Sequence, residues 1–250
     1  MDRSFLSHAG VVAASREFVC IRPSTYESAK EAPFLESLFR GRSGNLENTI
    51  FAILAPDGRT RLCRTGRSPS FAYGSPDDMA RAMQQILRKY PGTAPANATL
   101  PLLPDVRLAI NVAACDSTPL AILYAPDPTT RSALQQKLIG LAWHKNLVGR
   151  MQYCVATKPE ELKSLAATGV RPGLLVVQPG AYGTSGQVVT SRLLGSSSGD
   201  LQDALQLGIL LSEFQQKVMR THVARGRQLG INWKTAIPVT DPGGRRRRRP

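Results

Sequence analysis

The sequence is poor in the residues that usually build metal and redox sites. Its 250 residues include only four cysteines, Cys20, Cys63, Cys115 and Cys154, and three histidines. No two cysteines are close enough to form a Cys-x-x-Cys or a zinc motif, and no histidine has the spacing of a metal ligand. We therefore expect no metal and no cofactor. Cys20 and Cys154 lie within apolar segments, so we expect both to be buried, reduced thiols.

Long apolar runs and a targeting signal are also lacking. No apolar run approaches the roughly 18 to 20 residues needed to cross a bilayer, so we expect a soluble protein without a transmembrane segment. The first residues, MDRSFLSHAGVVAASREF, show no cationic segment ahead of a long apolar stretch. They do not resemble a secretory signal, and the expected location is the cytoplasm.

Positive charge is plentiful, and most of it lies near the C-terminus. The formal net charge is +14, and the residues from Lys217 onward contain ten Lys or Arg against one acid, Asp241, which accounts for nine of these charges. Such a run is typically a solvated tail that can bind polyanions. The polyanion-binding candidates are Arg225, Arg227, Lys234, Arg245, Arg246, Arg247, Arg248 and Arg249. The only aromatic residue among them is Trp233, so stacking on single-stranded nucleic acid is not indicated.

The second half of the chain alternates strand and helix patterns. A strand, PLAILYA, runs through a Pro-Asp-Pro turn into a helix, TTRSALQQKLIGLAW; then come a strand, MQYCVA, a short helix, KPEELKSLAATGV, and two strands, GLLVVQPGAYGTSGQVVTSRLL. A helix is expected over about 200–220, and residues 106–114, VRLAINVAA, are expected to add an edge strand. This order predicts an α/β unit. The Gly-rich segment 180–186 joins two strands, so it lacks the strand-to-helix context of a phosphate loop.

With Val170-Arg171-Pro172 standing immediately before the third strand, this order resembles the thioredoxin fold. In that family a Cys-x-x-Cys begins the first long helix, and a cis-proline faces it across a substrate groove. Here the helix begins with Asp127, Pro128, Thr129 and Thr130, Pro172 falls at the cis-proline place, and the cysteine pair is absent. The resemblance implies a groove between these four residues and Arg171-Pro172, in which an extended peptide lies by main-chain hydrogen bonds.

The first half follows a similar plan. It offers a strand, EFVCIRP, helices on both sides of Pro33, a hairpin over 49–66 with a Pro-Asp-Gly turn, and a helix that begins near Ser75. The two halves together predict two tandem thioredoxin-like domains, each a central mixed sheet flanked by helices. The first is truncated at its N-terminus, because the chain starts at or inside the helix that should follow the central strand. The expected boundaries are an incomplete domain at 1–92, a linker at 93–104, a domain at 105–222 and a largely disordered basic tail at 223–250.

These observations favour a redox-inactive protein that serves as a peptide-binding, protein-binding or assembly module. One alternative is a thiol-disulfide oxidoreductase whose active cysteines lie upstream of this chain, or which uses Cys115, the one cysteine in a loop-like context. A further alternative is polyanion binding, to nucleic acid or an acidic surface, through the Arg-rich tail. No other residue is a catalytic candidate, because no histidine is placed to activate a hydroxyl.

Overall fold

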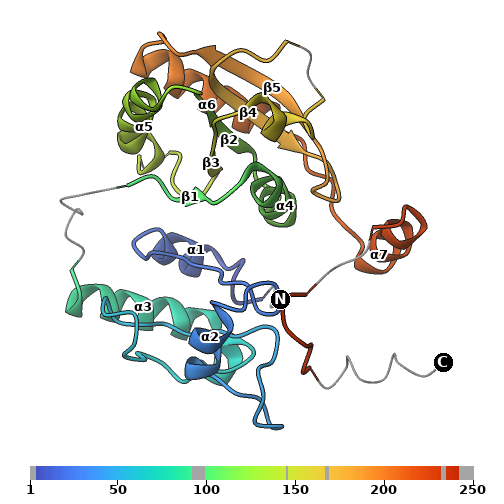
Figure 1. Cartoon of the computed structure of the whole chain (residues 1–250). Helices are drawn as coiled ribbons and strands as arrows, with labels where there is room; N and C mark the ends of the chain where they lie inside the picture. The colour runs from blue at the N-terminus through green and yellow to red at the C-terminus, as the bar shows by residue number, and fades with distance from the viewer. Residues whose placement is uncertain (1–3, 92–98, 145, 167–168, 232–234, 242–250) are drawn as a thin grey trace. The chain divides into compact units, whose positions relative to one another are not determined.

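The chain divides into two units in the computed structural model, which describes residues 4–91, 99–144, 146–166, 169–231 and 235–241 (Figure 1). Unit 1 comprises Met1–Thr93 together with Asn232–Pro250, and unit 2 comprises Ala94–Ile231. Unit 2 is therefore continuous in sequence, whereas unit 1 is built from both ends of the chain. No helix among the described residues is long and apolar enough to span a membrane.

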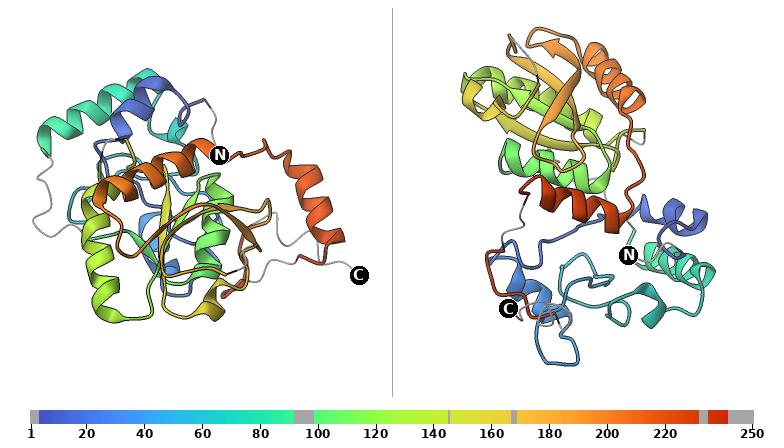
Figure 2. Two further views of the ribbon diagram at one scale, coloured as in Figure 1. Left: turned by 90° about the horizontal axis from the view of Figure 1, so that it is seen from above. Right: turned by 90° about the vertical axis from the view of Figure 1, so that its right-hand side faces the viewer.

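Unit 2 is an α/β structure around a five-stranded mixed sheet (Figures 1 and 2). The strands are β1 (Leu102–Leu103), β2 (Leu120–Tyr124), β3 (Gln152–Ala156), β4 (Gly173–Pro179) and β5 (Gly186–Leu193). Their order in the sheet is β1-β3-β2-β4-β5. β1, β3 and β2 are parallel, whereas β4 is antiparallel to β2 and β5 is antiparallel to β4. The α/β class expected from the sequence is therefore confirmed.

Helices cover both faces of this sheet. On one face α5 (Pro128–Ala142) and α6 (Ser198–Leu211) pack on alternate residues of β2 and β4, such as Leu123 and Val176. On the other face α4 (Val106–Asp116) and the short 3₁₀ helix η2 (Pro159–Leu162) pack on the intervening residues, such as Ile122 and Leu175. The central strand β2 is buried along its whole length. Such burial explains its uninterrupted apolar sequence, because both of its faces lie in a core.

The segment expected to be an edge strand, 106–114, is a helix instead. Asp105 caps α4 by accepting a hydrogen bond from the Leu108 N–H at 2.7 Å, and the buried residues recur at helical spacing. The edge strand β1 lies just before α4, within the segment expected to be a linker. The helix expected over 200–220 ends at Leu211, and a separate helix, α7 (Met219–Gln228), follows it.

Unit 1 has two small cores and no strand longer than an isolated bridge among its described residues. One core packs α1 (Ala9–Ser15) against α3 (Pro76–Lys89), which lie side by side in Figure 2. The helix α3 begins after Ser75, which caps it as expected. The other core lies around α2 (Ala32–Leu38). A short 3₁₀ helix, η1 (Pro69–Phe71), completes the described helical segments.

The expected hairpin of unit 1 forms, but the expected strand does not. The hairpin pairs Phe51 with Gly66, and at its turn the Asp57 carboxylate accepts hydrogen bonds from the Arg59 and Thr60 N–H groups. The segment EFVCIRP has no strand pairing, and Val19 is 82% exposed. In unit 2 the matching strand β3 lies between two parallel neighbours, whereas the described part of unit 1 offers this segment no strand to pair with. The tandem plan is therefore not reproduced in unit 1.

The residues expected to form a disordered tail include two ordered pieces. α7 is held to unit 2 by Tyr182, whose ring stacks on His222 at 4.3 Å between ring centroids and whose hydroxyl donates to the His222 carbonyl at 3.1 Å. The residues 235–241 belong to unit 1, where Ile237 joins the core around α2. These contacts depend on residues far away in sequence, which a local charge pattern does not reveal.

Candidate functional site

The residues of the expected groove meet at one end of the unit 2 sheet. Tyr124, the last residue of β2, is paired with Gly173, the first residue of β4. The segment that leads into α5 and the Arg171-Pro172 segment therefore adjoin each other at this end. The six groove candidates thus follow β2 or precede β4 at the same end of the sheet: Asp127, Pro128, Thr129, Thr130, Arg171 and Pro172.

The peptide bond before Pro172 is trans, because no peptide bond among the described residues is cis. The expectation of a cis-proline is therefore wrong. The chain turns into β4 at Gly173 instead, where φ is +151° and a Cβ atom would lie 1.9 Å from the Arg192 carbonyl oxygen. Only glycine fits this close approach of two backbones.

The side chain of Asp127 caps the N-terminus of α5. The Asp127 carboxylate accepts hydrogen bonds from the Thr130 N–H at 2.7 Å and from the Thr130 hydroxyl at 3.0 Å. These bonds from Thr130 hold the pKa of Asp127 below its usual range. Pro128 occupies the first turn, where its missing N–H has no cost. The start of α5 therefore holds a capping carboxylate and no thiol.

Beside the Arg171-Pro172 segment lies an open trough of about 460 Å³. Its floor comes from one face of β4 and β5, on which Leu175 and Val188 belong to the core beneath α4, and Leu193 is paired with Gly173. One wall comes from the segment before β4, and another from the turn between β5 and α6. The lining residues are Gly169, Val170, Arg171, Leu175, Val188, Ser191, Arg192, Leu193 and Ser196.

The main chain of the wall before β4 makes few hydrogen bonds to other described residues. Within the part of the chain that the structure describes, no backbone hydrogen bond involves Val170 or Arg171. Val170 is half-buried and Arg171 is exposed, so these groups are within reach of water or of a ligand. They lie directly beside the apolar floor of the trough.

The rim of the trough is cationic. Arg171 is exposed, and no carboxylate among the described residues forms an ion pair with it. Arg192 also lines the trough, and it lies close enough to Asp200 to contribute to the lowering of the pKa of Asp200, after the bonds from Ser197. The Asp200 carboxylate accepts those bonds from the hydroxyl and N–H of Ser197 and caps α6.

The thiols do not gather at this site. Cys154 is fully buried in β3, and desolvation raises its pKa to about 12. Cys115 is exposed, but it lies in the last turn of α4 rather than in a loop. That end of a helix carries partial negative charge and does not favour a thiolate anion. Cys20 is exposed on the segment that forms no strand, so the expectation that it is buried is wrong. Among the described residues, no three His, Cys, Asp or Glu side chains come together as a metal site requires.

Of the polyanion-binding candidates, the structure describes two. Arg225 and Arg227 are exposed in the last turn of α7. Lys234 and Arg245 to Arg249 lie outside the described residues.

Of the six groove residues expected from the sequence, Arg171 lines the trough and the other five do not, and the floor and the second wall of the trough were not expected. Leu193 is the clearest omission, since it is 53% exposed beside the trough. Its place depends on the register of β5 against β4, which the sequence does not contain. Comparison of this chain with protein-family models, with curated proteins and with solved structures found no match.

Proposed function

We propose that unit 2 is a thioredoxin-like module that binds extended peptides and performs no thiol chemistry. The strand order, with parallel β1, β3 and β2 followed by antiparallel β4 and β5, agrees with that fold, as does the helix α5 between β2 and β3. The proposal is confined to unit 2, because the described residues of unit 1 form no sheet.

The observation that carries this proposal is the trough beside Arg171. An apolar floor accepts side chains of a ligand, and the backbone groups of Val170 and Arg171, which make no hydrogen bond to the backbone of another described residue, offer hydrogen bonds to its main chain. This combination suits an extended peptide better than a compact small molecule, because the trough is open along one side of the sheet. The binding surface needs no cysteine, which agrees with the capping role of Asp127 at the start of α5.

The charges at the rim favour peptides with acidic residues. Arg171 and Arg192 line the trough, and of these only Arg192 lies near a carboxylate among the described residues. Arginine forms paired, charge-assisted hydrogen bonds with carboxylates. We expect such pairing to act mainly on selectivity and on the association rate.

The test is a screen of random extended octapeptides, followed by a two-dimensional NMR titration of the ¹⁵N-labelled full chain with the peptides selected. We expect the amide signals of Val170, Arg171 and Leu193 to shift together. Arg171→Glu should weaken binding of acidic peptides at least about tenfold, because one attraction becomes a repulsion. Leu210→Glu is the matched control, since Leu210 is 78% exposed but does not line the trough. Shifts confined to other surfaces would refute the proposal.

A second candidate function, polyanion binding, is favoured by α7. This helix carries Arg220, Arg225 and Arg227, and none of them forms an ion pair with a described residue. Binding to a labelled DNA duplex should fall steeply with added salt if these arginines contact phosphates. It should weaken further when Arg220 and Arg227 are replaced by Gln. Binding that is indifferent to salt and to these substitutions would remove this candidate.

A further inference from the structure

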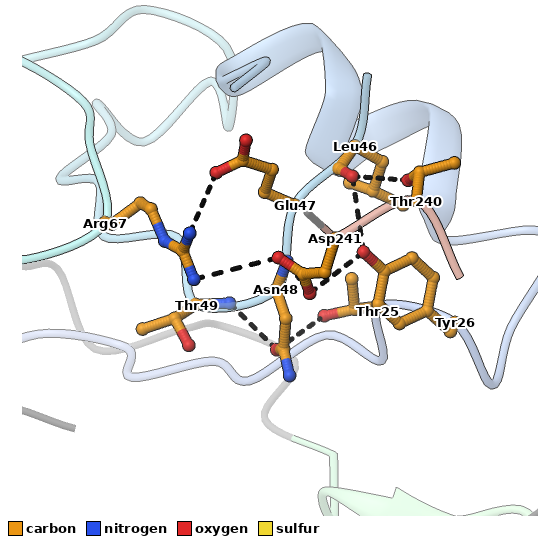
Figure 3. A network of polar contacts seen from close by, with 9 residues as sticks. All are labelled: Thr25, Tyr26, Leu46, Glu47, Asn48, Thr49, Arg67, Thr240 and Asp241. Atoms are coloured by element: carbon orange, nitrogen blue, oxygen red, sulfur yellow. Dashed lines mark hydrogen bonds and ion pairs between the residues drawn. The ribbon is translucent and has the colours of Figure 1, made fainter. Parts of the chain in front are cut away.

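The C-terminal segment Ala236–Asp241 lies against unit 1 as a bound peptide would (Figure 3). Its backbone is joined to unit 1 at one residue, since the Tyr26 carbonyl accepts hydrogen bonds from the N–H groups of Ala236 and Ile237, at 2.7 and 3.2 Å. The Ile237 side chain packs into the core formed by Tyr26, Leu35 and Leu46. Four residues later the Asp241 carboxylate ends the described contacts. An apolar anchor and an acidic anchor thus hold an otherwise extended segment.

Three polar groups of unit 1 contact the Asp241 carboxylate. The Asp241 carboxylate accepts the Asn48 N–H at 3.0 Å, lies 3.1 Å from the Tyr26 hydroxyl, and forms an ion pair with Arg67 at 3.7 Å (Figure 3). Arg67 also pairs with Glu47 at 3.0 Å, and Glu47 is 5% exposed. The guanidinium is therefore positioned by a buried carboxylate before Asp241 arrives. We call the set Tyr26, Glu47, Asn48 and Arg67 the cradle.

The backbone of the cradle is strained at the point of recognition. Thr49 has φ +69°, a left-handed conformation that β-branched residues rarely adopt. Its N–H donates to the Asn48 side chain at 2.8 Å, so this conformation is held locally. Strain of this kind costs free energy and persists where a structure holds a functional geometry. Here it accompanies the Asn48 N–H that meets Asp241.

The segment itself is only lightly held. None of its residues is buried: Ile237, Thr240 and Asp241 are half-buried, whereas Ala236, Pro238 and Val239 are exposed. The Thr240 hydroxyl adds one bond, to the Leu46 carbonyl. Segments with few buried apolar contacts open at low free-energy cost. The segment 236–241 can therefore detach from the cradle at low free-energy cost.

We propose that the cradle is a peptide-recognition site for an extended segment with an aliphatic residue and, four positions later, an aspartate. The chain's own residues Ala236–Asp241 are its resident ligand, and a second copy of the chain supplies the same segment in trans when the resident one opens. This site belongs to unit 1 and does not depend on the trough of unit 2.

The first experiment measures binding of a fluorescein-labelled peptide that matches residues 235–244 to the full chain. Asp241→Lys places a cation opposite Arg67 and releases the resident segment. We expect the peptide to bind this variant at least about tenfold more tightly than it binds the wild-type chain, in which the attached segment competes at high effective concentration. The same peptide with asparagine in place of its aspartate is the matched control. It should bind several times more weakly, because it lacks the negative charge that pairs with Arg67.

Circular dichroism verifies that the variant is folded. If it is not, Thr240→Ala takes its place, because it removes only the contacts of the Thr240 hydroxyl with the Leu46 carbonyl and with Tyr26; an intermediate gain in peptide affinity is expected. Equal weak binding to the wild-type chain and to a folded variant would overturn the proposal. So would equal binding of the two peptides.

The second experiment tests exchange between copies by mixing two variants. Asp241→Lys has an intact cradle and a defective segment, whereas Arg67→Gln has a defective cradle and an intact segment. Circular dichroism first verifies that both variants are folded, because Arg67→Gln also removes the charged partner of the buried Glu47 carboxylate. Light scattering after gel filtration should give the monomer mass for each alone and a 1:1 dimer for the mixture. A mixture that stays at the monomer mass, while the peptide binds Asp241→Lys, would overturn the role of the second copy.

Discussion

Replacement of Gly208 by alanine tests how closely α6 lies on the sheet. A Cβ atom at Gly208 would lie 2.3 Å from a methyl carbon of Val176, which is inside any normal contact distance. Alanine also favours the helix over glycine by about 1 kcal/mol. Overpacking in a core costs about 1–3 kcal/mol. Since Val176 is β-branched and fully buried, it has little freedom to move aside.

We therefore expect Gly208→Ala to lower the free energy of unfolding of unit 2 by about 1 kcal/mol, the overpacking cost minus the helix gain. The matched control is Gly140→Ala in α5, because a Cβ atom there would meet nothing within 4 Å. This control should raise the free energy of unfolding by about 0.5–1 kcal/mol. The sign difference between two equal substitutions isolates the close contact with Val176.

The assay is urea unfolding followed by the fluorescence of Trp143, which lies directly after α5 in unit 2. The sequence has one other tryptophan, so the measurement uses a Trp233→Phe background. Midpoints and slopes are compared for the parent and the two alanine variants. If Gly208→Ala raised the midpoint as Gly140→Ala does, α6 would not lie this close to β4, and the packing described here would be refuted.

Three further predictions concern single groups. Arg67→Ala should destabilise unit 1 by about 2–4 kcal/mol in urea unfolding, because it leaves the buried Glu47 carboxylate without its partner; a loss below about 0.5 kcal/mol would contradict this pairing. The pKa of Asp57, lowered to about 2 mainly by the Thr60 hydroxyl, should be visible in an NMR titration of its carboxyl carbon and should rise in Thr60→Ala. Because this pKa is depressed in the folded state, the stability it contributes is present above about pH 4 and is lost as the pH falls towards 2. Of the four thiols, Cys154 should react slowest with a chromogenic disulfide at neutral pH, since burial raises its pKa to about 12, and rapid labelling there would contradict its place in β3.

The sequence predicted the elements whose signals are local. The strands β2 to β5 and the helix α5 lie where their patterns indicated. The helix α4 was missed because its run of small and apolar residues reads as a continuous strand, although its buried positions Val106, Ala109, Ile110 and Ala113 follow helical spacing. β1 has only two residues, too few to leave a pattern.

The candidate sites show the same division between local and distant information. The order of the strands predicted a groove between Arg171-Pro172 and the start of α5, and the pairing of Tyr124 with Gly173 puts both segments at the same end of the sheet. The floor of the trough was not predicted, since it depends on the register by which Leu193 meets Gly173. The contact between Asp241 and Tyr26 joins residues 215 positions apart, so a reading of the tail as a basic run missed it.

Unit 2 is inserted within unit 1 along the chain, because residues 235–241 return to the core around α2. During synthesis, domains generally fold as they emerge, beginning with the N-terminal one. Here Ile237 and Asp241 are made only after the whole of unit 2. Unit 2 is thus free to fold before this segment can make its contacts with unit 1, although unit 2 begins later in the sequence.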